Sequence, residues 1–188
     1  MNAVAEAVVA KPLRLDFGCG KSCKEGFTGV DRRKFPGVEF VTDLNERWPW
    51  DDNSMDEGHM SHVLEHFTGV QRVHIFNELW RVSKPGAKTL IITPHWNSDR
   101  AYGDFTHQWP PVAEMLWYYV SRKWRKDNAP DNDIEWNPQG YDCDFEATWG
   151  HGLRQDLLVR NQEYQIFALT NFRSAATDLI ATVTAVKP

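Results

Sequence analysis

Polar residues follow short apolar stretches at three places where they suit a nucleotide-like ligand. Asp16 precedes the loop Gly18-Cys19-Gly20, and Asp31 and Asp43 each end a later stretch. The glycines permit positive φ and let a ligand press against backbone amides, while an aspartate can accept both hydroxyl hydrogens of a ribose. Asp43 can accept from an adenine amino group while Leu44 covers the ring. One such aspartate is typical of a solvated turn, whereas three in succession favour a binding site.

The stretch Ser61-His-Val-Leu-Glu-His66 carries three metal-ligating side chains. His62, Glu65 and His66 lie at i, i+3 and i+4, so they share a face if the stretch is helical. The order also matches the His-x-x-Glu-His pattern of zinc hydrolases, which requires the whole motif on a helix and a third ligand downstream. That interpretation leaves the glycine loop and the aspartates without a role. We therefore expect a candidate divalent-metal site, or a Glu65 and His66 that hydrogen-bond the start of a helix.

Two more histidines and a carboxylate follow the next apolar stretch. They are His95, Asp104 and His107. A histidine can supply a base near neutral pH, and a neighbouring carboxylate can fix its tautomer. We predict a catalytic role for these three residues. The alternative is a loop pinned by histidine-to-backbone hydrogen bonds.

The elements that must position these residues alternate between strands and helices. Short apolar stretches predict strands over residues 13–17, 26–31, 37–43, 55–62, 87–94, 163–169 and 176–186. Apolar residues at spacings of three and four predict helices over 70–82 and 112–124. This order favours an α/β fold: a Rossmann-like open sheet, mostly parallel with an antiparallel last strand, with helices on both faces. Ligands of such sheets bind beyond the carboxyl ends of the strands, where the residues above converge.

Length and composition indicate one globular domain. We expect an N-terminal tail over 1–12 and a single domain over 13–188, with an insertion at about 95–160 that caps the site. The segment 127–151 shows no pattern that predicts its structure. No apolar run approaches the roughly 20 residues of a membrane span. The three cysteines suggest no disulfide framework, so we expect a soluble protein of the reducing cytoplasm.

The net charge of −5 disfavours contact with polyanions except through a local patch. One candidate patch is the segment 117–126, which combines aromatic side chains with four basic ones. Such a mixture can stack and hold a nucleic acid or an acidic substrate. The alternative is a helix with one buried face and one solvated face.

Taken together, the motifs resemble the small class I methyltransferases, which use S-adenosylmethionine. The residues that carry the resemblance are Gly18 to Lys21, Val30-Asp31, Asp43 to Asn45, Ser61 to His66 and Glu78 to Gly86. It runs from about Leu13 to His107 and implies a seven-stranded sheet with an antiparallel seventh strand. The chain departs from the family in lacking the third glycine of the loop. Few residues separate the loop from the next predicted strand, so a first helix has two turns at most.

The resemblance also assigns roles by position. It implies a methionine pocket at Asp16, Gly18, Cys19 and Gly20, a ribose contact at Asp31, an adenine contact at Asp43 and Leu44, and a wall beneath the sulfonium at Ser61 and His62. The small-RNA 2′-O-methyltransferases and the ubiquinone-pathway O-methyltransferases have a similar Glu-x-x-Glu-His metal motif. Here His62 replaces its first glutamate, and the remaining ligands are Glu65 and His66.

The implied reaction is methyl transfer to an unidentified acceptor: a small molecule in the first place, or a sugar or nucleic acid. Transfer from a sulfonium chiefly needs alignment, plus a base if the acceptor is a hydroxyl or a protonated nitrogen. We expect His95 or His107 to be that base. A non-catalytic nucleotide- or partner-binding module on the same fold is the alternative.

Overall fold

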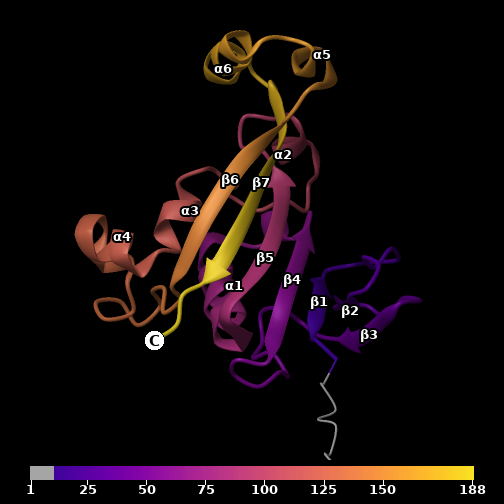
Figure 1. Cartoon of the computed structure of the whole chain (residues 1–188), viewed down its shortest axis with the longest axis vertical. Helices are drawn as coiled ribbons and strands as arrows, with labels where there is room; N and C mark the ends of the chain where they lie inside the picture. Colours follow the sequence, from indigo (N-terminus) through magenta and orange to yellow (C-terminus); the bar gives the residue numbers. More distant parts are fainter. Residues whose placement is uncertain (1–10) are drawn as a thin grey trace, which may run out of the picture.

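Seven strands form one sheet in the order β3-β2-β1-β4-β5-β7-β6 (Figure 1). The computed structural model describes residues 11–188, so most of the tail predicted over 1–12 lies outside the described residues. The strands are β1 (Arg14–Phe17), β2 (Thr28–Asp31), β3 (Val38–Val41), β4 (Met55–Ser61), β5 (Ser83–Pro94), β6 (Phe145–Leu153) and β7 (Ala176–Ala185). β1 to β5 are parallel, and β7 is antiparallel to its neighbours β5 and β6. The predicted Rossmann-like sheet with an antiparallel last strand is confirmed.

One face of the sheet carries the core, because apolar side chains recur there at every second residue. Phe17, Met60, Ile91 and Ala181 stand in one row across β1, β4, β5 and β7, and each is at most 1% exposed. The helix α1 (Gly69–Val82) packs on this face, in agreement with the helix predicted over 70–82. The core therefore lies between α1 and this face of the sheet, and the same strands carry the predicted site at their carboxyl ends.

The remaining helices are short. They are η1 (Leu64–His66), α2 (Arg100–Gly103), α3 (Leu116–Tyr119), α4 (Arg122–Asn128), η2 (Pro130–Asn132), α5 (Gln155–Leu158) and α6 (Gln162–Asn171). Figure 1 shows α5 and α6 projecting beyond the end of the sheet, between β6 and β7. Within residues 11–188, none of the helices is long and apolar enough to cross a membrane.

The opposite face of the sheet is more open. Residues 18–27 join β1 to β2, and residues 32–37 join β2 to β3, by turns and bends in place of helices. As a result, His59 and Leu90 on this face are only half-buried, and Ile180 is 37% exposed. The sequence predicts helices on both faces, and this face is covered more sparsely than that. The strand topology is as predicted.

Two predicted elements were wrong. Residues 163–169 lie in the helix α6, not in a strand, because Asn161 caps the helix by accepting from the Tyr164 amide at 2.9 Å. The strand that pairs with β7 is β6 instead, inside the segment without a predicted structure. The helix predicted over 112–124 is two short helices, α3 and α4. Ser121 separates them in extended conformation and caps α4.

Candidate functional site

Two cavities meet beyond the carboxyl ends of the parallel strands. The first, the aspartate cavity, has a volume of about 760 Å³ and is lined by Gly18, Asp31, Asp43 and Leu44 among others. The second, the histidine cavity, measures about 570 Å³. It is lined by His62, Glu65, His66, Pro94, Arg100, Gly103, Asp104, Phe105 and His107. Since His62, His66 and Phe105 line both, the cavities are neighbours with a shared wall.

The loop after β1 has a shape that only glycine allows at position 18. Gly18 has a φ of +66°, and a Cβ there would lie 2.4 Å from Cγ2 of the buried Val63. Asp31 holds the loop in place, since its carboxylate accepts from the amides of Gly20 at 3.0 Å and Arg33 at 2.9 Å. Asp31 thus shapes the loop and still presents carboxylate lone pairs to the aspartate cavity.

Asp16 supports the loop from beneath. Its carboxylate accepts from the Lys24 amide at 2.7 Å and lies 2.6 Å from Nδ1 of His59. Asp16 is 3% exposed and is not among the residues that line either cavity. Cys19, Gly20 and Ser61 are half-buried and line neither cavity, so these predicted contacts lie around the aspartate cavity rather than in its wall. Burial, followed by the charge of Asp16, raises the pKa of the Cys19 thiol.

Asp43 and Leu44 lie where the sequence predicts them. Oδ1 of Asp43 accepts from the backbone and side-chain nitrogens of Asn45, both at 2.9 Å, which closes an Asx turn after β3. The turn fixes the carboxylate, and its second oxygen has no such bond to Asn45. Leu44 is 6% exposed and provides an apolar wall of the aspartate cavity.

His62 occupies the wall between the cavities in a strained backbone conformation. Its φ is +55°, which is uncommon outside glycine and concentrates at functional sites. Its Nδ1 lies 3.2 Å from Oε1 of Glu65, and its Nε2 lies 3.8 Å from Oδ1 of Asp178. The hydrogen bond to Glu65 raises the pKa of His62.

Glu65, His66 and His107 bring their ligand atoms within 4.8 Å of one another. His107 must donate through Nδ1, since that atom lies 3.2 Å from the carbonyl oxygen of Ala101. Nδ1 of His66 lies 3.0 Å from the Thr106 hydroxyl, which donates to Asp104 at 2.6 Å. His66 therefore also donates through Nδ1, and both Nε2 atoms keep a lone pair.

Glu65 completes this arrangement from a buried position. The residue is 4% exposed, and its Oε2 is buried without a hydrogen-bond partner among the described residues. An orphaned buried carboxylate oxygen is costly unless a ligand or ion satisfies it. Two imidazole lone pairs and a carboxylate are a ligand set typical of divalent transition metals. His107, which the sequence places far from the motif, joins this set, and His62 contacts Glu65 from the side.

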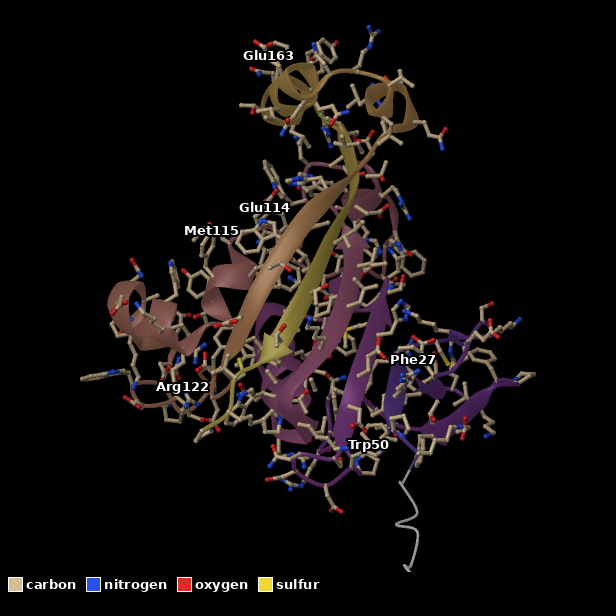
Figure 2. The ribbon with its side chains drawn as sticks, viewed as in Figure 1. Phe27, Trp50, Glu114, Met115, Arg122 and Glu163 are labelled. Carbon is tan, nitrogen blue, oxygen red and sulfur yellow. The ribbon has the colours of Figure 1, made fainter. Side chains whose placement is uncertain are left out.

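His95 lies away from both cavities. The Asn97 amide donates to its Nδ1 at 3.2 Å, so its Nε2 donates to Glu114 at 2.8 Å. His151 and Trp96 also bond to Glu114, at 3.0 and 2.8 Å. Both ring nitrogens of His95 are therefore used in a cluster that joins the segment before α3 to β6 and to the residue after β5. Figure 2 shows Glu114 of this cluster beside β6. Sequence reasoning missed Glu114 and His151, because their partners are far away in the chain.

Glu114 should contribute a pH-dependent part of the stability. The hydrogen bond from His95 lowers its pKa from 4.5 to about 2. A lowered carboxylate pKa stabilises the fold above about pH 4.5, and this contribution is lost as the pH falls toward 2. We expect Glu114→Gln to remove roughly 1–2 kcal/mol at pH 7, allowing for solvent screening of a partly exposed side chain. Urea unfolding from pH 7 to 3 should show this difference narrowing, with the exposed Glu25→Gln as control. A difference in unfolding free energy that stays constant from pH 7 to 3 would contradict a lowered pKa of Glu114 as its cause.

The basic side chains of segment 117–126 are paired with carboxylates of the same chain. Arg125 is fully buried and forms an ion pair with Asp133 at 3.0 Å. The other basic side chains of the segment also lie beside carboxylates: Arg122 beside Asp142, Lys123 beside Asp127 and Lys126 beside Glu135. Trp117 is 1% exposed in the core. The alternative of a helix with a buried face and a solvated face describes this segment better than a nucleic-acid site.

The comparison with protein families gives one match. Residues 21–91, which contain Asp31, Asp43 and the His62 to His66 motif, match the family described as "Methyltransferase domain". The chain is similar to this family over that part of its length. A comparison with curated proteins gave no match. This match and the fold bear out the predicted class I methyltransferase and its enzyme class.

Solved methyltransferases share the fold over nearly the whole domain. An S-adenosylmethionine-dependent methyltransferase from Archaeoglobus fulgidus superposes with a TM-score of 0.61 at 17% identity, covering 93% of this chain and 86% of that one. A Mesorhizobium loti S-adenosylmethionine-dependent methyltransferase gives 0.50 at 14%, covering 93% and 91%. The Burkholderia thailandensis 1,6-didemethyltoxoflavin-N1-methyltransferase, solved with its acceptor and S-adenosylhomocysteine, gives 0.55 at 11%, covering 94% and 72%. At these identities the likeness concerns the fold.

Proposed function

We propose that the aspartate cavity binds S-adenosylmethionine and that the histidine cavity holds the hydroxyl group to be methylated. The observation that carries this proposal is the shared wall of His62, His66 and Phe105, because a methyl group must pass between two adjoining sites. A neighbour of the same fold binds S-adenosylhomocysteine together with its acceptor, which supports a two-site arrangement.

The residues of the aspartate cavity fit the cofactor. Asp31 and Asp43 offer carboxylate lone pairs for the ribose hydroxyls and the adenine amine, and Leu44 offers an apolar surface for the ring. Gly18 leaves the backbone open for close approach. When bound, the cofactor supplies an electrophilic methyl group on sulfur. The chain's own task is to bind it, align it with the acceptor and exclude water.

Asp31→Ala should weaken S-adenosylmethionine binding by roughly 1–3 kcal/mol, because it strands hydroxyl groups that the carboxylate would satisfy. Asp31 also fixes the Gly20 amide, so the loop loses an anchor in the same variant. Calorimetric titration measures the change, and Asp127→Ala, which removes an exposed carboxylate on α4, is the control. Unchanged affinity in a folded Asp31 variant would remove this residue from the site.

We further propose that Glu65, His66 and His107 hold a divalent cation beside the acceptor hydroxyl. This set replaces His62 of the sequence motif with His107, because His107 has a free Nε2 lone pair. Asp104 supports the set through Thr106, which fixes His66. Such a cation would act as a Lewis acid and lower the pKa of the hydroxyl.

A second candidate needs no metal. The free Nε2 of His107 could take the hydroxyl proton itself, in keeping with the base that the sequence predicts. His95 has no place in either version, because its ring nitrogens are bonded to Asn97 and Glu114.

Residues 100–107 lie in the predicted insertion over 95–160 and support its role as a cap on the acceptor. The three free cysteines support a reducing, cytoplasmic setting.

The test is a single-turnover assay with methyl-labelled cofactor and a panel of hydroxyl acceptors: small molecules, sugars and nucleic acids. We expect transfer to oxygen in one of these classes. Cofactor binding without transfer to any hydroxyl acceptor would favour a nitrogen acceptor or a non-catalytic nucleotide-binding module. The absence of cofactor binding would refute the proposal altogether.

A further inference from the structure

Four basic side chains beside the aspartate cavity form no ion pair. They are Lys21, Arg32, Arg33 and Lys34, all of them exposed, and we name them the basic rim. No carboxylate of residues 11–188 lies within 4.0 Å of any of their charged nitrogens. In segment 117–126, by contrast, each basic side chain lies beside a carboxylate. The charge of the basic rim is therefore available to a ligand.

Three of the four cations lie at one aromatic ring or line the cavity, while Nζ of the fourth, Lys34, donates to the carbonyl of Val38. The charged groups of Lys21 and Arg33 lie 5.8 and 5.0 Å from the ring centre of Phe35. Arg32 and Arg33 also line the aspartate cavity. Phe35 itself is half-buried, so part of this residue stays accessible. Cations beside exposed aromatic surface are the combination with which proteins hold unpaired nucleotides.

The local charge is opposite to that of the chain. Residues 21–34 contain five basic and two acidic side chains, an excess of three positive charges in a chain whose net charge is −5. Of the two acids, Asp31 is engaged by the backbone amides of Gly20 and Arg33. The field of the whole protein repels a polyanion, so such a ligand would be directed to the basic rim.

The position of the basic rim favours a polymer over a small molecule. It borders one part of the aspartate cavity, while His62, His66 and Phe105 form the wall toward the histidine cavity. An acceptor confined to the histidine cavity would leave the basic rim unused. A strand that lies across the cavity mouths can contact the rim with its phosphates while one of its units enters the histidine cavity. That unit must be unpaired, because a duplex keeps its bases stacked and enclosed.

We infer that the basic rim binds the phosphate backbone of a single-stranded nucleic acid that carries the methyl acceptor. The inference rests on the proposed function for its last step only. Binding to the rim requires neither cofactor nor methyl transfer, so the two can fail separately.

Fluorescence anisotropy with labelled RNA and DNA strands of about 12 nucleotides, without cofactor, tests the inference. Four phosphate contacts predict that log K falls with log salt at a slope of about −3. Arg33→Ala/Lys34→Ala should halve the slope and weaken binding about 25-fold at 0.1 M salt. The matched control is Lys123→Ala/Lys126→Ala, which removes two basic residues that are already paired and should leave affinity and slope unchanged.

Strand binding that depends on the basic rim supports the rim as a nucleic-acid site even if no methyl group is transferred. In that case the proposed function fails, and with it only the last step of the inference, that the strand carries the acceptor. Transfer to a small molecule with no binding of RNA or DNA overturns the inference and leaves the proposed function intact. Equal binding of heparin or anionic vesicles, or equal loss of binding in both double variants, also overturns it, because the site would then be a general polyanion surface.

Discussion

His107→Ala is expected to lower kcat by roughly 10²- to 10⁴-fold, the range typical when a group that acts on the transferred proton is lost. The reason is that His107 lines the histidine cavity and keeps Nε2 without a hydrogen bond, since Nδ1 donates to Ala101 and the Asp104 carboxylate lies 3.9 Å from Nε2. Affinity for S-adenosylmethionine should hardly change, since His107 does not line the aspartate cavity. The control is His74→Ala, because His74 lies on α1, bonds to the carbonyl of Glu46 and lines neither cavity. A His107 variant that folds and turns over at the parent rate would remove this residue from the mechanism.

The same variant separates the two versions of the proposed site when it is combined with chelation. If Glu65, His66 and His107 hold a cation, a chelator should abolish turnover of the parent enzyme and an added divalent metal should restore it. The His107 variant should then contain less metal by elemental analysis. If chelation leaves full activity while His107→Ala loses it, the metal is excluded and His107 is the base.

Gly18→Ala should cause the largest loss of cofactor binding, through the structure of the loop. The φ of +66° costs an alanine about 1–2 kcal/mol, and the overlap of its Cβ with Val63 adds roughly 1–3 kcal/mol. Val63 is β-branched and buried, so it has little freedom to give way. We expect the variant to bind S-adenosylmethionine at least 100-fold more weakly, as the loop must move out of its present position (about 2.7 kcal/mol or more).

Gly20→Ala is the matched control for that experiment. Gly20 has a similar φ of +57°, but a Cβ there would meet no heavy atom within 4 Å. It should therefore show only the backbone penalty of about 1–2 kcal/mol in urea unfolding. Equal effects of the two substitutions on cofactor affinity would show that the contact with Val63 does not shape the site.

The sequence predicted the sheet and the aspartate cavity because both depend on local patterns. Asp31 ends β2 and Asp43 follows β3, and parallel strands bring their carboxyl ends to one edge whatever the loops contain. Helix α1 was equally predictable from its spaced apolar residues. The strand β6 was missed although Phe145, Ala147 and Trp149 alternate in its sequence, since the glycines and polar residues around it indicated a loop.

The histidine cavity depends on contacts between distant segments, which the sequence did not reveal. His107 joins Glu65 and His66 only because the loop after β5 folds back over η1, where the Gln108 amide donates to the Glu65 carbonyl at 2.8 Å. His95 looked equivalent to His107 in sequence, but Glu114 and Asn97 occupy both of its ring nitrogens. Tertiary hydrogen bonds thus decide which of the two loop histidines keeps a ring nitrogen without a hydrogen bond.

Charge patterns were misleading for the same reason. The basic residues of segment 117–126 stood out in the sequence, but Arg125 is buried on Asp133 and the others lie beside carboxylates. The basic rim is less conspicuous, because acidic residues are interspersed among Lys21, Arg32 and Arg33. Only the structure shows that the carboxylate of Asp31 is turned toward backbone amides and leaves these cations unpaired.

Calorimetric titration of the purified chain with S-adenosylhomocysteine, alongside NAD, tests the central claim most directly. Both ligands carry an adenosine, but only S-adenosylhomocysteine carries the sulfur that the proposed function places at the wall shared with the histidine cavity. We predict one-to-one binding of S-adenosylhomocysteine that is at least tenfold tighter than that of NAD (about 1.4 kcal/mol). Equal or tighter binding of NAD, or no heat with S-adenosylhomocysteine, would contradict the assignment of the aspartate cavity.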